Sequence, residues 1–292
     1  MRNTRRHGLV MCRVVVVFSS CISFFGNALA QVDADDVQAL RVCLLANNLP
    51  YASRSENAGF DLDTASAVAR ILERPLEWIW TDNPADIQEI EESDFPLRRL
   101  ARGDCDLILS MPGPAAETLG GDGSLVLGEA YYGAAFELVG CGNDLPSGLR
   151  ALRERTVAIQ SQTVAHFALL MVQAKTKTYF AIDAALAGIA DGEAEAGLLW
   201  GPAAGWELHR TGNRQCTLSA DYRPPVAVRW NLHAATREAD GELRLRIDAA
   251  LLDLSTTDRL RNIGRGYGIP VRPPFEMTYS LRALNELQRT GE

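Results

Sequence analysis

The chain has 292 residues and a formal net charge of −8, with 37 acidic against 29 basic side chains. This negative charge argues against a nucleic-acid partner, because binding to phosphates needs an excess of Lys and Arg. A chain of this length has room for one large core or for two medium-sized lobes.

Residues 1–30 have the organisation of a secretory signal peptide. Arginines lead into the apolar run Val14–Phe25, and the segment closes on Ala28-Leu29-Ala30. The run is shorter than the roughly 20 residues of a membrane span. Two variants, a twin-arginine signal around Arg5-Arg6 and a lipobox ending at Cys21, fit their surroundings poorly. We therefore expect a periplasmic protein with no membrane span in the mature chain.

The mature chain is more acidic than the whole, because the signal peptide takes four arginines and no acidic residue with it. Its net charge is about −12. Such a charge favours docking onto a basic protein surface, and it fits a merely soluble acidic protein equally well.

The first half of the mature chain begins with a βαβ pattern. Leu40–Leu45 predicts a buried strand, the helical apolar period from Asp61 to Leu72 predicts a helix, and Leu76–Trp80 predicts a second strand. The acidic segment 82–94 has no apolar face and is expected to be solvated, before a helix over Leu97–Ala101.

Two stretches share one pattern. In Gly103–Gly113 and in Gly192–Pro202 a Gly-acid turn closes a helix, a short apolar strand follows, and a loop with Pro and Gly ends the strand. The strands are Cys105–Ser110 and Ala196–Trp200. Since the loops after the carboxyl ends of strands form the ligand crevice of open α/β sheets, we expect the two loops to face each other across a cleft. The alternative is a pair of ordinary βα turns in one sheet.

The middle of the chain predicts two crossings between lobes. After a mobile loop over Pro112–Gly123, Ala135–Gly140 is the first crossing strand, and Arg223–Trp230 is the return crossing. The expected first lobe is 38–134 with 229–292, and the second lobe is 135–228.

Within the second lobe, Thr156–Ile159 predicts a strand, and Val164–Ala174 and Ile182–Ala190 predict helices. Beyond the return crossing, apolar spacing from Leu243 to Leu254 predicts one face of a long helix. Tyr267–Pro270 ends the helical region. A C-terminal helix over 281–287 is expected to pack on the first lobe.

Four cysteines follow the signal peptide: Cys43, Cys105, Cys141 and Cys216. Export to an oxidising compartment predicts two disulfides, for which three connectivities are possible. The lobe assignment favours Cys43–Cys105 and Cys141–Cys216. One concern is register, since Cys43 lies late in its strand and Cys105 begins its own, so their Cα atoms would exceed the roughly 7 Å that a disulfide tolerates if the strands were offset.

The sequence shows no catalytic or cofactor-binding motif. None of the three mature histidines lies in an HExxH or His/Cys cluster. A nucleophile elbow and a P-loop are absent, and Gly264-x-Gly266-x-Gly268 follows a helix, which is typical of a flexible helix end and not of a dinucleotide site. We therefore predict no metal, no cofactor and no enzymatic activity.

The candidate cleft residues are aromatic, amide and glycine side chains, which suit an uncharged group or a protein surface. Gln162 and Thr163 stand where helix N-terminal amides meet a ligand, while Trp200 and Trp206 equally fit the core. The full set is Asn47, Asn48, Tyr51, Met111, Tyr131, Tyr132, Gln160, Gln162, Thr163, Trp200, Gly201 and Trp206.

Over residues 38–271 the chain resembles the type II extracellular solute-binding proteins (family 3-like), and within them the MoxJ and XoxJ type that is associated with quinoprotein dehydrogenases. The stretches that carry the resemblance are Leu40–Cys43 with Asn47–Pro50, Gly103–Asp106, Tyr131-Tyr132, Trp200–Trp206 and Tyr267–Pro270. The resemblance implies a two-lobed periplasmic binding-protein α/β fold, each lobe a βα sheet joined by two crossing strands. It implies a PQQ-dependent alcohol or methanol dehydrogenase, with or without its cytochrome, as partner in methanol oxidation.

The chain departs from the amino-acid-binding relatives at two places. Ala116–Gly120 has no counterpart of their Thr-x-x-Arg, and Gly128-Glu129-Ala130 stands where relatives of this type often carry Arg-Pro. Without that arginine the bidentate capture of an α-carboxylate is lost. Arg54 and Arg102 are the nearest substitutes in sequence.

The leading hypothesis is therefore an accessory protein that docks on a quinoprotein dehydrogenase, with a small-molecule ligand as a further possibility. The alternative is the substrate-binding component of an ABC importer for a small polar solute. A dehydratase-like enzyme on the same fold is the third, with Glu129 as its only candidate carboxylate.

Overall fold

The computed structural model describes residues 38–82, 95–119, 123–142 and 145–278. The predicted signal peptide, most of the acidic segment 82–94 and the predicted helix over 281–287 lie outside these residues. Within them, no helix combines the length and the apolar character needed to cross a membrane.

The predicted βαβ unit is present. β1 (Leu40–Leu45) and β4 (Leu76–Thr81) pair in parallel, and α1 (Phe60–Ile71) connects them. The apolar face of α1 is buried as its helical period requires. Two short strands, β2 (Asn47–Asn48) and β3 (Ala52–Ser53), form a hairpin in the connection from β1 to α1.

The next segment is shifted relative to the prediction. α2 (Pro96–Arg102) ends at Gly103, whose φ of 83° is the left-handed conformation expected there. The following strand, β5 (Ile108–Pro112), begins later than the predicted Cys105, because the intervening residues bond to β1: Cys43 N–H donates to Leu107 O over 2.9 Å. β6 (Thr118–Leu119) lies in the segment predicted as a loop.

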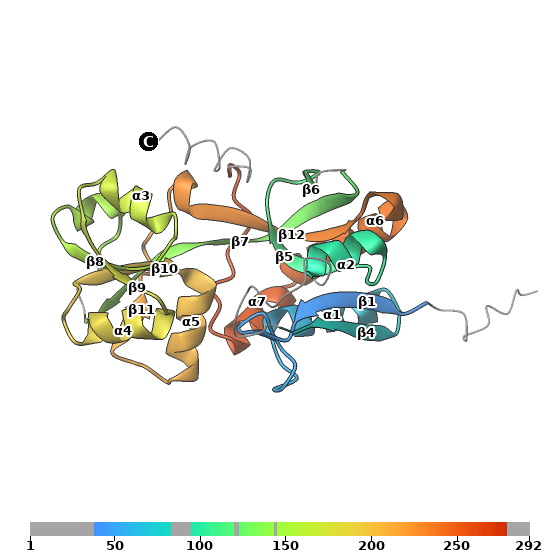
Figure 1. Ribbon diagram of the computed structural model, residues 1–292, viewed down its shortest axis with the longest axis horizontal. Helices are drawn as coiled ribbons and strands as arrows, with labels where there is room; N and C mark the ends of the chain where they lie inside the picture. The colour runs from blue at the N-terminus through green and yellow to red at the C-terminus, as the bar shows by residue number, and fades with distance from the viewer. Residues whose placement is uncertain (1–37, 83–94, 120–122, 143–144, 279–292) are drawn as a thin grey trace, which may run out of the picture. The chain divides into compact units, whose positions relative to one another are not determined.

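Two long antiparallel strands run side by side through the middle of the described chain (Figure 1). β7 (Leu125–Cys141) is one continuous strand that includes both Tyr131-Tyr132 and the predicted crossing. β12 (Arg229–Arg237) is the return strand, and it starts later than predicted, after the 3₁₀ turn η5 (Val226–Val228). The cause is local, since two consecutive prolines before η5 have no N–H for a ladder.

The sheet continues on both sides of this pair, in the order β5-β12-β7-β10-β8-β9. The added strands are β8 (Thr156–Gln160), β9 (Lys175–Tyr179) and β10 (Ala196–Trp200), while β6 and β11 (Cys216–Leu218) pair with β7. β10 has the predicted bounds. β9 was not predicted, because its Lys-Thr-Lys-Thr alternation offers no apolar face.

Five helices and two 3₁₀ turns complete the described elements. They are η4 (Leu149–Leu152), α3 (Ala165–Leu170), α4 (Ile182–Ala190), α5 (Gly201–Arg210), η6 (Glu238–Asp240), α6 (Gly241–Thr256) and α7 (Arg259–Gly266). α3 is shorter than the predicted Val164–Ala174. α4 has the predicted bounds, and α6 buries Ile247, Leu251 and Leu254 as predicted. The lobe boundaries 38–134, 135–228 and 229–292 stay a prediction.

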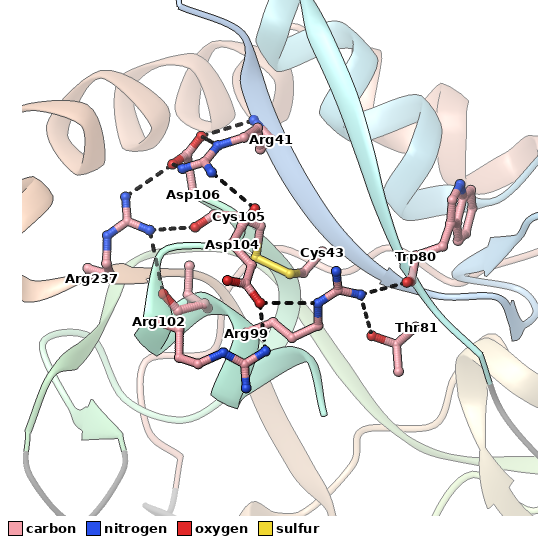
Figure 2. Close-up of a disulfide and its surroundings, with 11 residues drawn as sticks. Arg41, Cys43, Trp80, Thr81, Arg99, Arg102, Asp104, Cys105, Asp106 and Arg237 are labelled. Carbon is pink, nitrogen blue, oxygen red and sulfur yellow. Dashed lines mark hydrogen bonds and ion pairs between the residues drawn. A yellow bond between two sulfur atoms is a disulfide. The ribbon is translucent and has the colours of Figure 1, made fainter. Parts of the chain in front are cut away.

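The disulfides have the pairing that the lobe assignment favoured. The Cα atoms of Cys43 and Cys105 lie 5.7 Å apart, and those of Cys141 and Cys216 lie 3.9 Å apart. The register concern is resolved because the segment before β5 lies directly beside β1, as Figure 2 shows around the first bridge.

Beside that bridge, the buried carboxylate of Asp106 joins β1 to β12 (Figure 2). Arg41 donates to it from its backbone N–H at 3.0 Å and from its guanidinium at 3.1 and 2.6 Å. Arg237 on β12 donates at 3.1 Å. Burial raises the pKa of Asp106, but the hydrogen bonds and charges of the two arginines outweigh it and hold the pKa below its ordinary value.

We predict that peptide mapping under non-reducing conditions finds Cys43 linked to Cys105 and Cys141 linked to Cys216. Replacing Cys43 and Cys105 together by Ser should lower the free energy of unfolding by about 2–5 kcal/mol, because the reduced chain gains loop entropy. Denaturant titration measures it. A bridge such as Cys43–Cys216 would contradict the assignment.

We also predict that Asp106→Asn lowers stability by about 2–3 kcal/mol near neutral pH, since it removes charge-assisted hydrogen bonds. The pKa of Asp106 is depressed in the folded state, so its stabilisation is present above the ordinary Asp pKa and is lost as pH falls through the folded pKa. Denaturant titrations between about pH 2 and pH 7 should therefore show the gap between wild type and variant closing in acid. A gap that stays constant with pH would contradict this role.

Candidate functional site

A cavity of about 780 Å³ opens at the carboxyl ends of β1, β5 and β10. It is the place where the two predicted loops were expected to meet, and Met111, Pro112 and Trp200 line it together. The complete lining is Cys43, Leu44, Leu45, Asn48, Tyr51, Ala52, Asp61, Phe95, Pro96, Leu97, Arg98, Ile108, Leu109, Ser110, Met111, Pro112, Val164, Trp200, Trp230 and Leu232.

Aromatic side chains form one wall of the cavity. The rings of Trp200 and Trp230 meet edge to face with centroids 5.8 Å apart, and Phe136 packs against both. The indole N–H of Trp200 donates to the hydroxyl of Tyr51 over 3.0 Å. This bond ties the end of β10 to the loop after β2, so it fixes both sides of the cavity.

A polar cluster around Ser110 and Asp61 forms another part of the cavity lining. The hydroxyl of Ser110 donates to Asp61 Oδ1 at 2.6 Å. The same Ser110 oxygen lies 3.2 Å from the hydroxyls of Tyr131 and Tyr132, which are placed to donate to it. Ser110 has a φ of 55°, which a residue other than glycine adopts only at a cost of about 1–2 kcal/mol. The cluster therefore holds Asp61 in a defined position.

The start of α1 determines where the carboxylate of Asp61 points. The N–H of Gly59 donates to the hydroxyl of Tyr267 at 2.9 Å, and that hydroxyl donates to Asp63 Oδ2 at 2.8 Å. Gly59 has a φ of 150°, and a Cβ there would overlap the carbonyl oxygen of Tyr51. The first turn of α1 is thus fixed from both sides, and Asp61 is 6% exposed.

Burial raises the pKa of Asp61 to about 7, and the hydrogen bond from Ser110 acts against this rise. No basic side chain of the described residues forms an ion pair with Asp61 or lowers its pKa. The phenols of Tyr51, Tyr131 and Tyr132 have pKa values raised by burial, so they stay neutral. Asp61 is therefore a buried acid of the lining that has no ion-pair partner among the described residues.

Of the predicted cleft residues, Asn48, Tyr51, Met111 and Trp200 line the cavity. Tyr131 and Tyr132 lie behind it, buried, and reach it through Ser110. The others are not part of its lining: Asn47, Gln160, Gln162, Thr163, Gly201 and Trp206. For these residues a role in binding stays a prediction.

Local contacts account for the position of these outlying residues. Gln160 donates to the carbonyl of Phe180, and the hydroxyl of Thr163 donates back to the carbonyl of Gln160. The ring of Trp206 lies 6.0 Å from that of Tyr267 and stacks on His209 at 6.4 Å, away from Trp200. Trp200 ends β10 and Trp206 lies within α5, and their contacts differ, since Trp200 lines the cavity and Trp206 packs beside Tyr267.

The Trp-Gly-Pro stretch also has a packing role. A Cβ on Gly201 would lie 2.6 Å from Glu137 Cγ and 2.9 Å from the carbonyl oxygen of Ala135. One turn later, a Cβ on Gly205 would overlap the carbonyl of Gly268. These glycines let α5 approach β7 and the segment after α7 closely. The motif therefore fixes the position of α5 directly after Trp200, which lines the cavity.

The arginines expected as substitutes for a carboxylate clamp do not line the cavity. Arg54 is paired with Asp82, and Arg102 with Asp104. Arg98, an exposed residue of α2 that was not predicted, does line it. Glu129 is exposed and outside the lining, and its backbone N–H donates to Asp248 at 3.0 Å. No group of three or more His, Cys, Asp or Glu side chains in the described part is arranged to hold a metal ion.

No protein-family model matches the chain, and no curated protein matches it in sequence. Solved structures do match. MxaJ from Methlophaga aminisulfidivorans is 19% identical with a TM-score of 0.59, over 80% of this chain and 100% of that one. This chain has the periplasmic binding-protein fold. The unliganded, open L-cystine solute receptor of Neisseria gonorrhoeae is 14% identical with a TM-score of 0.65, over 80% of this chain and 94% of that one. A protein of Streptococcus pneumoniae is described as an amino-acid ABC transporter, and its second substrate-binding domain also matches. That domain is 17% identical with a TM-score of 0.61, over 78% of this chain and 99% of that one.

These matches establish the predicted fold class, the two-lobed α/β fold of type II periplasmic solute-binding proteins. At these identities they establish the fold alone. Two of the matched structures are described as a solute receptor and a substrate-binding domain.

We predict that Asp61→Asn stabilises the protein above neutral pH. Because the folded pKa of about 7 exceeds the ordinary value near 3.9, ionisation of Asp61 destabilises the fold, increasingly from about pH 4 and fully above about pH 7. The variant should therefore gain stability over wild type as pH rises from about 5 to about 8, by at most about 3 kcal/mol. Denaturant titrations at the two pH values measure the gain, and a difference between variant and wild type that does not grow with pH would refute it.

Proposed function

We propose that this protein is a periplasmic accessory protein that docks on a quinoprotein alcohol or methanol dehydrogenase, with or without its cytochrome. The observation that carries the proposal is that neither of the two arginines expected as substitutes for the carboxylate clamp, Arg54 and Arg102, is part of the cavity lining, which leaves Arg98 as its one arginine. The resemblance of Trp200–Trp206 to the dehydrogenase-associated type supports it, as does the structural match to MxaJ over 80% of this chain and 100% of that one.

The docking surface we propose includes Trp206. Its ring is half-buried beside Tyr267 and the exposed His209, on α5 and outside the cavity. Aromatic side chains in such positions are common centres of protein interfaces. The acidity of the mature chain favours a basic partner surface.

A second candidate function is the substrate-binding component of an importer for a small solute. The cavity itself favours it, because its volume and its few convergent polar groups are those of a small-molecule site. The location proposed for both functions is the periplasm, which the fold and the two disulfides support.

We predict that the immobilised mature protein captures a periplasmic PQQ-dependent methanol dehydrogenase, that capture weakens as salt is raised, and that Trp206→Ala reduces it at least tenfold. Phe180→Ala is the matched control, an aromatic residue that is 90% exposed elsewhere in the chain. Pull-down and surface plasmon resonance measure the effect.

Calorimetry against the common amino acids decides between the two candidates. Micromolar binding of an amino acid without capture of the dehydrogenase would reject the docking proposal and favour the importer. Loss of capture in Phe180→Ala and not in Trp206→Ala would move the docking surface to β9.

A further inference from the structure

Asp61 is a carboxylate that the described fold buries without a compensating charge. It lines the cavity, is 6% exposed and receives one side-chain hydrogen bond, from Ser110. Buried carboxylates elsewhere in the chain are paired: Asp106 with Arg41 and Arg237, and Glu137 with Arg272. Asp61 is therefore an exception within this fold, and it faces an open volume.

The groups around Asp61 are polar but neutral. The hydroxyls of Tyr131 and Tyr132 meet at Ser110, and the phenol of Tyr51 is close enough to be affected by the charge of Asp61. On α1 itself, Asp63 is engaged by Tyr267. Such surroundings orient a carboxylate and do not neutralise it. Arg98 on α2 is the one basic side chain of the lining, and it forms no ion pair with Asp61. A cation that enters the cavity and reaches Asp61 therefore has no ion pair of this carboxylate to break.

The remaining lining residues indicate which kind of ligand body fits the cavity beside the charged group. Trp200 and Trp230 present aromatic rings, and most of the other lining side chains are aliphatic. Aromatic rings attract organic cations, and aliphatic walls favour an apolar body. The volume of about 780 Å³ is within the range of small-molecule sites.

We propose that the cavity binds an organic amine with an apolar body, the protonated nitrogen resting on Asp61 and the body against the Trp200–Trp230 wall. This goes beyond the proposed function, since it holds whether or not the protein docks on a dehydrogenase. An α-amino acid is a poorer fit, because its carboxylate lies two bonds from the ammonium and would be brought next to Asp61, where like charges repel.

The experiment is isothermal titration calorimetry of the full mature chain with matched probes. 2-Phenylethylamine and n-hexylamine supply the cation with an aromatic and a linear body, 2-phenylethanol removes the charge, and L-phenylalanine adds the carboxylate. We expect at least one amine to bind with a Kd below about 100 μM, and the alcohol and the amino acid to bind at least tenfold more weakly. Near pH 6, titrations in buffers of different ionisation enthalpy should show proton release, since the amine displaces the proton of Asp61.

Variants separate Asp61 from its neighbours. Asp61→Asn should weaken amine binding at least tenfold, with circular dichroism confirming that the variant is folded. Glu73→Gln, which removes an exposed carboxylate just beyond the end of α1 and outside the cavity lining, should bind as wild type does. Ser110→Ala removes the donor that favours ionised Asp61, so its affinity should fall at about pH 7 and recover in part at about pH 8.5.

Three results would overturn the proposal: no binding of either amine at millimolar concentration, equal binding of the amine and the alcohol, or unchanged binding in Asp61→Asn. Tighter binding of L-phenylalanine than of the amine would also reject it, and would assign the cavity to amino acids, with Arg98 on the carboxylate. These readouts are independent of dehydrogenase capture, so failure of one proposal does not decide the other.

Discussion

The antiparallel pairing of β7 with β12 is the constraint on which the rest of the fold depends. β5 joins the sheet through β12, and β10 joins it through β7, so two of the three strands whose ends line the cavity take their positions from this one pair. The ladder runs from Arg229–Ala135 to Arg237–Leu125 with shifts of register around His233. Such irregularities bend a strand locally and re-aim its side chains. They occur where Met111 and Tyr132 turn towards the site.

Ion pairs and a disulfide hold neighbouring segments in place beside the β7–β12 pair. Asp106, Arg41 and Arg237 tie β1 to β12 beside the Cys43–Cys105 bridge, and Glu137 on β7 holds Arg272 beyond α7 at 2.7 Å. These carboxylates have charged partners, although burial still raises the pKa of Glu137 despite its pairing with Arg272. Asp61 differs because its one donor is a hydroxyl. Because ionised Asp61 has no charged partner, its burial lowers the stability of the folded protein, and this cost falls at the cavity.

Periodicity made most elements predictable, and the misses have local causes. Helical spacing identified α1, α4 and the buried face of α6, and a short apolar run gave the bounds of β10. β9 was not predicted because its sequence pattern is polar. The start of β5 was predicted too early because Cys105 is held by a disulfide and not by the hydrogen bonds of a strand pair. At the site, Asp61 resembled an ordinary acid in the first turn of a helix. Only the fold brings Ser110 and the tyrosines against it.

The same geometry explains why docking and ligand binding are compatible in one chain. Trp206 and Trp200 lie on the same helix–strand junction but point to different sides, one towards Tyr267 and one into the cavity. Close glycine contacts at Gly201 and Gly205 leave α5 little freedom to shift alone. Trp200 ends β10 and Trp206 lies on α5, so the cavity wall and the outer surface are built from consecutive elements.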